Sequence, residues 1–218
     1  MAAMMNRTKI ADDVFLVRFQ TQYEVASTFL RFQEYFESRR FSGRVFTLEQ
    51  FMDWYAKEFG NFTYFQDWSG FNIPSRVLTP FYEGRFEPLL EKEQRLLDLF
   101  RNDTGLFYVI GVSAPFSRGE LWHELAHALY FVRPEYRSAV ADAMKHHDTS
   151  SLESALYRSG YGRHVLKDEA HCYLLTGATG ILSAHERVKL ETLRKELRVI
   201  FNNHGADLLR TTWKRIGR

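Results

Sequence analysis

The residues with the clearest chemical potential are His123, Glu124 and His127, which together form the pattern H-E-x-x-H. Two histidines four residues apart lie one turn apart on the same face of a helix. Both imidazoles can then bind one metal ion, and the glutamate beside the first histidine can reach a water held by that ion. If the segment is helical, the pattern predicts a hydrolytic site built on Zn²⁺.

The residues around the motif indicate that it does lie on a helix. Ser117 followed by Glu120 is a capping-box pattern at the expected start. Pro134 ends the helix and disfavours helical geometry at the residue before it. Between these limits an apolar stripe is spaced to face a core, and it consists of Leu121, Leu125, Ala128, Leu129 and Val132.

A catalytic zinc ion needs a third protein ligand, because such sites usually combine three side chains with a water. The metzincin continuation of the motif requires Gly at position 130 and His or Asp at position 133. Those positions hold Tyr130 and Arg133, which excludes that class. The remaining candidates are Asp168, Glu169 and His171, on a predicted buried helix over residues 165–176.

Among these candidates we prefer Glu169 as the third ligand. Its helical neighbours are largely apolar, namely Val165, Leu166, Cys172 and Tyr173, so its side chain is expected to point toward the core. A carboxylate buried in such surroundings must be paired or bound to a metal. His171 and Asp168 remain the alternatives.

With these residues the chain resembles the gluzincin branch of the zincin metallopeptidases. The resemblance covers His123, Glu124 and His127 as H-E-x-x-H, and the stretch from Glu169 to Tyr173 against the family pattern E-x-x-A-D on a later helix. It implies a mixed sheet ahead of the motif helix, with an edge strand that binds extended substrate. Cys172 replaces the usual Ala, and Tyr173 replaces an Asp that orients a metal-binding histidine, so the resemblance assigns no partner to that histidine.

The combined interpretation is a zinc-dependent peptidase acting on a peptide or protein substrate. His123, His127 and Glu169 would bind the metal, and Glu124 would move the proton of the attacking water to the leaving amine. The oxyanion needs a further donor, for which Tyr161, between two glycines, and His164 are the candidates.

Three alternatives accompany this interpretation. The chain could be a zincin-like protein that binds a peptide or partner without cleaving it, or a helical structural protein without metal. A nucleophilic pair of Cys172 and His171 is the weakest alternative, because adjacent residues on a helix are not expected to face each other.

The remaining sequence predicts an α+β fold that is mostly helical, with a small mixed sheet before the motif helix. Strands are expected at 14–19 and 106–112, and residues 61–80 are expected to be irregular or a hairpin around an aromatic cluster. We expect residues 1–104 to form an aromatic-rich helical region and residues 105–218 to form a zincin-like metal-binding region, the two together making one compact unit. Helices are expected at 20–38, 47–60, 87–101, 135–145, 151–158, 165–176 and 183–202.

Composition supports an ordinary globular protein of 218 residues with a net charge of +2 and 45% hydrophobic residues. All but three of the 19 Phe residues fall at or before Phe107, which predicts an aromatic core or binding surface in the first half. The single cysteine, Cys172, and the lack of a leader-like apolar run favour a cytoplasmic protein. No membrane or nucleic-acid partner is expected, and the oligomeric state stays open.

Overall fold

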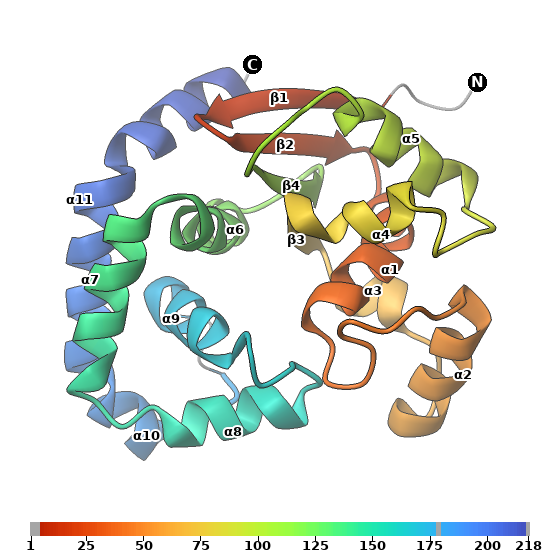
Figure 1. Cartoon of the computed structure of the whole chain (residues 1–218). Coiled ribbons are helices and arrows are strands. Elements are labelled where there is room, and N and C mark those ends of the chain that lie inside the picture. The colour runs from red at the N-terminus through yellow and green to blue at the C-terminus, as the bar shows by residue number, and fades with distance from the viewer. Residues whose placement is uncertain (1–4, 178–179, 217–218) are drawn as a thin grey trace.

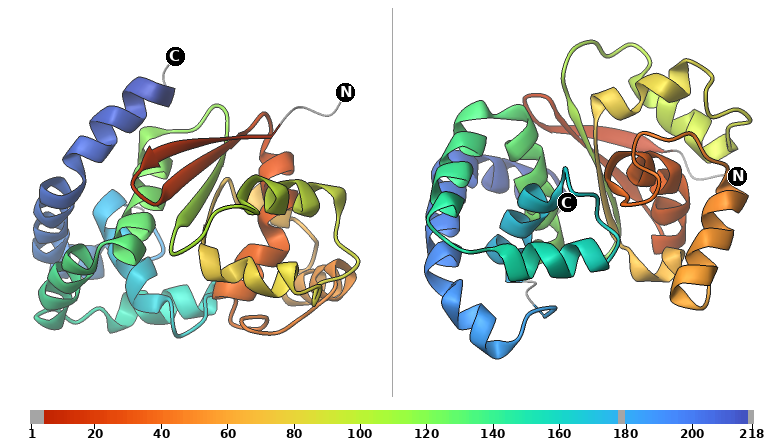
Figure 2. Two further views of the ribbon diagram at one scale, coloured as in Figure 1. Left: turned by 45° about the horizontal axis from the view of Figure 1, so that its top comes forward. Right: turned by 60° about the horizontal axis from the view of Figure 1, so that its bottom comes forward.

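A four-stranded sheet lies between two groups of helices, as the views in Figures 1 and 2 show. The computed structural model describes residues 5–177 and 180–216, with 206–216 described by their backbone alone. The expected α+β class is confirmed, with a small mixed sheet and a majority of helix. The strands are β1 (Asn6–Ala11), β2 (Val14–Phe19), β3 (Gly70–Pro74) and β4 (Tyr108–Ser113).

Each helix expected from the sequence has a counterpart in the structure. The helices before β4 are α1 (Gln22–Glu37), α2 (Leu48–Phe59), α3 (Tyr64–Asp67), the 3₁₀ turn η1 (Ser75–Val77), α4 (Thr79–Tyr82) and α5 (Glu91–Phe100). Those after it are α6 (Arg118–Val132), α7 (Pro134–Lys145), α8 (Ser150–Arg158), α9 (Leu166–Thr176), α10 (Ala184–Lys189) and α11 (Glu191–Ile216). The short helices α3 and α4 and the 3₁₀ turn η1 add to the elements expected from the sequence.

The strand order is β1-β2-β4-β3, so β3 is the edge strand on the side of the motif helix. β1 and β2 form an antiparallel hairpin, β2 and β4 pair in parallel, and β4 pairs with β3 in antiparallel. The sheet therefore combines three strands from residues 1–104 with one from 105–218. The two regions expected from the sequence share this sheet.

Side chains alternate between two hydrophobic cores, one on each face of the sheet. On β4, Tyr108 and Ile110 enter the core with α6, α9 and α11, whereas Val109 enters the core with α1 and α5. The second core holds most of the phenylalanines of the first half, which confirms an aromatic core there. Within the predicted cluster of residues 64–71, Tyr64 and Phe71 are fully buried.

The motif helix α6 begins and ends where the sequence indicates. The Ser117 hydroxyl accepts a hydrogen bond from the Glu120 amide at 3.1 Å, and the Glu120 carboxylate accepts one from the Ser117 amide at 2.6 Å. Arg133 leaves the helix in an extended conformation before Pro134. The capping box thus holds the first turn of the helix, one turn ahead of His123.

Three further elements differ from the sequence expectation. Residues 61–80 contain the strand β3, which Gly70, Asn72 and Pro74 conceal in the sequence but which pairing with β4 stabilises. β1 was not expected, because it is a largely exposed and polar strand at the other edge. The helix expected at 183–202 is interrupted at Leu190 and forms two helices, α10 and α11. No residue of α10 is buried, whereas α11 packs against the core and continues to residue 216.

Among the described residues, no helix is long and apolar enough to cross a membrane.

Candidate metal centre

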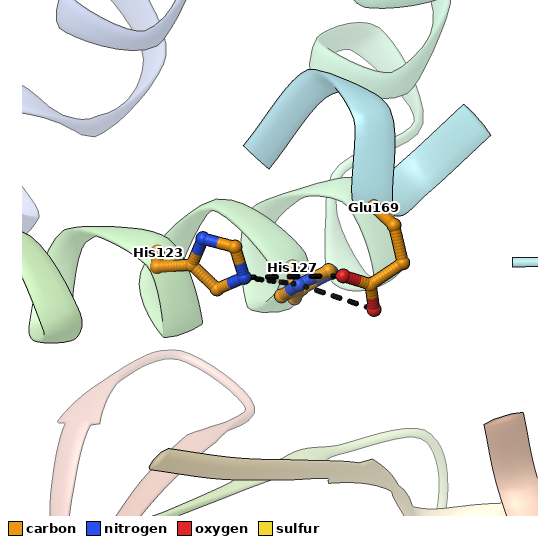
Figure 3. A group of neighbouring side chains, drawn as sticks. All are labelled: His123, His127 and Glu169. Atoms are coloured by element: carbon orange, nitrogen blue, oxygen red, sulfur yellow. Dashed lines mark hydrogen bonds and ion pairs between the residues drawn. The ribbon is translucent and has the colours of Figure 1, made fainter. Parts of the chain in front are cut away.

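His123, His127 and Glu169 converge at one point between α6 and α9 (Figure 3). The two histidines project from one face of α6, as their spacing predicts, and Glu169 reaches across from the first turn of α9. One ligand atom from each residue can be chosen so that all three lie within 4.8 Å of one another. Of the three candidates for a third ligand, Glu169 is the one that meets both histidines.

The separations between these atoms suit a small tetrahedral ion. The two Nε2 atoms of His123 and His127 are 3.3 Å apart, and tetrahedral zinc with bonds of roughly 2.0–2.1 Å places its nitrogen ligands about 3.3 Å apart. The carboxylate oxygens of Glu169 lie 3.6 Å from His127 Nε2 and 3.9 Å from His123 Nε2. The donor set of two imidazoles and one carboxylate is also the kind that zinc prefers.

Glu169 is a buried carboxylate whose Oε2 has no hydrogen-bond partner. Its exposed fraction is 3%, and burial raises its pKa to about 8. A divalent cation at this point would satisfy the orphaned oxygen and favour the ionised form. The residues present therefore fit a metal ion.

Asp168 lies behind His127 and contacts the other nitrogen of that imidazole. Its Oδ2 is 3.0 Å from His127 Nδ1, and its Oδ1 is 3.3 Å from His171 Nδ1. Burial works to raise the pKa of Asp168, but the charge and hydrogen bonds of His127 and His171 outweigh it and hold that pKa below its usual value. Asp168 therefore lies where a carboxylate can fix the orientation of the His127 ring.

A second group of candidate ligands, His127, Asp168 and Cys172, shares His127 with the first. It lies on the interior side of that imidazole, where Asp168 is already bonded to two histidines. The thiol of Cys172 is fully buried, and burial raises its pKa well above the usual value. Since neither Asp168 nor Cys172 lines the cavity described below, the first group is the one that a substrate could reach.

The expectation that His171 and Cys172 do not face each other is wrong. Cys172 Sγ lies 3.4–3.6 Å from the ring nitrogens of His171. The His171 ring also stacks on Tyr130 of α6, with ring centroids 5.0 Å apart. Both side chains are buried away from the cavity, and the protonated thiol is a poor nucleophile there.

Glu124 lies on the wall of the same cavity as the metal-binding group. Its Oε2 accepts a hydrogen bond of 2.7 Å from the side-chain amide of Asn72 on β3. Only 5% of Glu124 is exposed, and burial raises its pKa to about 7. A carboxyl group with a pKa near neutrality can both accept and return a proton at physiological pH.

The cavity has a volume of about 480 Å³ and opens between the two helical groups. Such a volume is within the range of roughly 300–1,000 Å³ found for small-molecule sites. Aromatic side chains of the first half, including Trp54 and Trp68, form one wall. Its described lining contains neither Lys nor Arg but six carboxylates, which are Glu34, Glu37, Asp67, Glu120, Glu124 and Glu169.

Tyr161 lines the cavity next to Tyr173, and their hydroxyl oxygens are 3.3 Å apart. The Tyr173 ring lies 5.1 Å from the His123 ring, centroid to centroid. The loop that carries Tyr161 is tied to the end of α1 by backbone hydrogen bonds, from Gly162 to Glu37 and from Arg39 to Gly160. Burial raises the pKa of Tyr161 well above its usual value, so the phenol stays protonated and able to donate.

His164, the other predicted donor to an oxyanion, lies elsewhere. Its Nε2 is 2.7 Å from the carbonyl oxygen of Phe36 and 3.4 Å from the Ser42 hydroxyl. It is absent from the described lining of the cavity. The structure therefore groups Tyr161, but not His164, with the three candidate metal ligands.

Comparisons of the chain with family models, curated proteins and solved structures gave no match. The interpretation of the site consequently rests on its geometry and chemistry.

Several residues of the site carry no signal of that role in the sequence, among them Asn72 and the α1 carboxylates Glu34 and Glu37, and Tyr173 carries only a weak one. The α1 glutamates appear in the sequence as the polar face of an amphipathic helix, and only the packing of α1 beside β3 places them in a cavity. The spacing of Tyr173 could have indicated its place in the site, because it follows Glu169 by one helical turn.

Proposed function

We propose that the protein is a zinc-dependent peptidase in which His123, His127 and Glu169 bind the metal and Glu124 acts as general base. The observation that carries the proposal is the meeting of two imidazoles and one orphaned carboxylate oxygen at the wall of a cavity that also contains the buried Glu124. The orphaned oxygen differs from other unpaired buried atoms in that its carboxylate also faces two imidazoles, an arrangement that a bound cation would complete.

The roles of the residues follow from their surroundings. When bound, the metal would polarise the scissile carbonyl and lower the pKa of a water. Glu124 would accept the proton of that water and then donate it to the leaving amine. Asp168 holds the imidazole of His127 in the tautomer that leaves Nε2 free to bind. Tyr161, with Tyr173 beside it, would donate a hydrogen bond to the developing oxyanion.

The metal site is tested by measuring zinc per chain by elemental analysis of untagged protein. We expect one zinc ion per chain in the wild type and its loss in Glu169→Ala, because two imidazoles alone hold the ion weakly. Glu120→Gln is the matched control, since Glu120 lines the same cavity but lies outside the metal-binding group. No zinc in the wild type after reconstitution, or full zinc in Glu169→Ala, would contradict the proposed ligand set.

Catalysis is tested with Glu124→Gln, which keeps the hydrogen-bonding shape of the side chain but removes the base. We expect zinc content to be unchanged and peptide hydrolysis to fall by about 10²–10⁴-fold. Hydrolysis is measured on a peptide library read by mass spectrometry. A zinc-loaded wild type that cleaves no peptide would instead favour the alternative of a zincin-like protein that binds a peptide or partner without cleaving it.

The cytoplasmic location expected from the sequence stays a prediction.

A further inference from the structure

Asn72 occupies an unusual position, at the centre of the edge strand β3 and almost fully buried. Its side-chain amide donates to Glu124 Oε2 at 2.7 Å, and its side-chain oxygen accepts a hydrogen bond from the Tyr108 hydroxyl. Its backbone amide donates to Gln33 Oε1 at 3.0 Å. Three elements, α1, β4 and α6, thus hold a single residue.

The direction of this hydrogen-bond chain is set by its end at Glu124. Asn72 presents its NH₂ group to Glu124 Oε2 and its oxygen to the Tyr108 hydroxyl, the arrangement that suits a carboxylate accepting hydrogen bonds in its ionised form. The backbone amide of Asn72 points away from β4 and donates its hydrogen bond to Gln33 of α1. Helix α1 therefore covers this part of the β3 edge, where another strand could otherwise pair. The backbone amide, the side-chain NH₂ group and the side-chain oxygen of Asn72 are thus all hydrogen-bonded, which fixes the orientation of the side chain.

The other oxygen of the carboxylate, Oε1, lies against Gly70 at the start of β3. A side chain at Gly70 would overlap this oxygen, so glycine is the residue that leaves room for it. Gly70 and Glu124 both line the cavity. Oε2 of Glu124 is therefore hydrogen-bonded to a residue of the sheet, and Oε1 lies beside Gly70 at the cavity wall.

We propose that Asn72 is a positioning residue for the reaction, which anchors Oε2 of Glu124 so that Oε1 is the oxygen that transfers the proton. Tyr108 and Gln33 hold Asn72 itself, and Gly70 reserves the space for Oε1. The inference rests on the proposed function, because it assigns Glu124 the role of base. A general base must be held within hydrogen-bond reach of its proton, and misplacement by about 1 Å can cost about 10²-fold in rate.

The kinetic test compares Asn72→Ala and Asn72→Asp with the wild type. We expect kcat to fall by about 10–100-fold in both variants, with KM within about twofold and zinc per chain unchanged. Asn72→Asp keeps the size of the side chain but cannot donate to a carboxylate when ionised. Ile73→Val is the matched control: it trims a fully buried side chain of the same strand on the opposite face and should leave kcat unchanged. A kcat within twofold of the wild type in Asn72→Ala would overturn the inference.

A second measurement needs no catalysis. In metal-free protein labelled with ¹³C at the glutamate carboxyl carbons, the Glu124 signal is identified by its loss in Glu124→Gln. We expect this signal to shift in Asn72→Ala and to keep its position in Ile73→Val, because only the first variant removes the hydrogen bond. An unmoved signal in Asn72→Ala would overturn the inference, whereas absence of peptidase activity in the zinc-loaded wild type would overturn the proposed function alone.

Discussion

His127 uses both nitrogens of its imidazole ring, and this distinguishes it from His123. Its Nε2 faces the metal-binding point, and its Nδ1 lies 3.0 Å from Asp168. Asp168 precedes Glu169 in the chain, so the proposed metal ligand and the carboxylate that contacts His127 Nδ1 are neighbours on the first turn of α9. Their side chains project about 100° apart on the helix. Asp168 can therefore contact Nδ1 of His127, while Glu169 approaches Nε2 of the same ring at the cavity.

Removal of the orienting carboxylate should weaken metal binding without abolishing it. We expect Asp168→Ala to lower zinc affinity by about 10–100-fold, because His127 would lose the bond that sets its tautomer and ring orientation. Affinity is measured by competition with a chromogenic chelator. Asp142→Ala, at an exposed position of α7, removes a carboxylate of the same kind and should leave the affinity unchanged. Equal affinities in the two variants would contradict the role of Asp168.

At the scale of elements, the cavity depends on how closely α1 approaches the sheet. Gly111 of β4 faces the Phe29 ring of α1, and Phe29 in turn stacks on Phe71 of β3 with ring centroids 5.8 Å apart. A Cβ atom at Gly111 would lie 2.5 Å from the Phe29 ring. The glycine therefore sets the depth at which α1 packs, and with it the position of Gln33 and the α1 glutamates.

Filling this space should destabilise the protein. We expect Gly111→Ala to lower the free energy of unfolding by about 1–3 kcal/mol, because a core with no free volume must shift to admit a methyl group. The measurement is chemical denaturation followed by tryptophan fluorescence. Gly119→Ala is the control, because a Cβ atom at Gly119 would lie 3.8 Å from the Ser117 hydroxyl, an ordinary contact, so this variant should be at least as stable as the wild type. A Gly111→Ala variant as stable as the wild type would show that α1 is free to move.

At the scale of the whole molecule, the sheet joins two cores, and the cavity lies where both helical groups reach the edge strand β3. Folding collects six carboxylates around this cavity without a lysine or arginine in its described lining. Burial raises the pKa of Glu34 to about 7, despite hydrogen bonds from Tyr64 and Ser38. Keeping Glu34 ionised at neutral pH therefore costs the folded protein free energy.

This cost predicts a pH dependence of stability. Between pH 4.5 and about 7 the folded state binds more protons at Glu34 than the unfolded state does, so the free energy of unfolding should fall as pH rises through this window. With partial solvent screening, the contribution of Glu34 is about 2 kcal/mol. Denaturation of metal-free protein at several pH values should give a smaller decrease for Glu34→Gln than for Glu49→Gln, an exposed control on α2. Equal decreases would contradict the assignment to Glu34.

The sequence by itself determined the local features of the site. The capping box at Ser117, the stop at Pro134 and the four-residue spacing of the histidines are short-range patterns, and each describes one helix without reference to the rest of the chain. The apolar neighbours of Glu169 likewise indicated that its side chain is buried, since the face of a helix can be derived from its period. These residues meet as that reasoning expected.

Only the tertiary structure decided how separate elements meet. Asn72 looks like a turn former in the sequence, yet pairing of β3 with β4 makes it a strand residue that holds Glu124. The choice between Asp168 and Glu169 as the residue that faces both histidines depended on the angle at which α9 packs on α6. His164, close to Tyr161 in the chain, points to α1 because the loop is bound there by its backbone. Such contacts arise from packing between residues far apart in sequence, which no local pattern encodes.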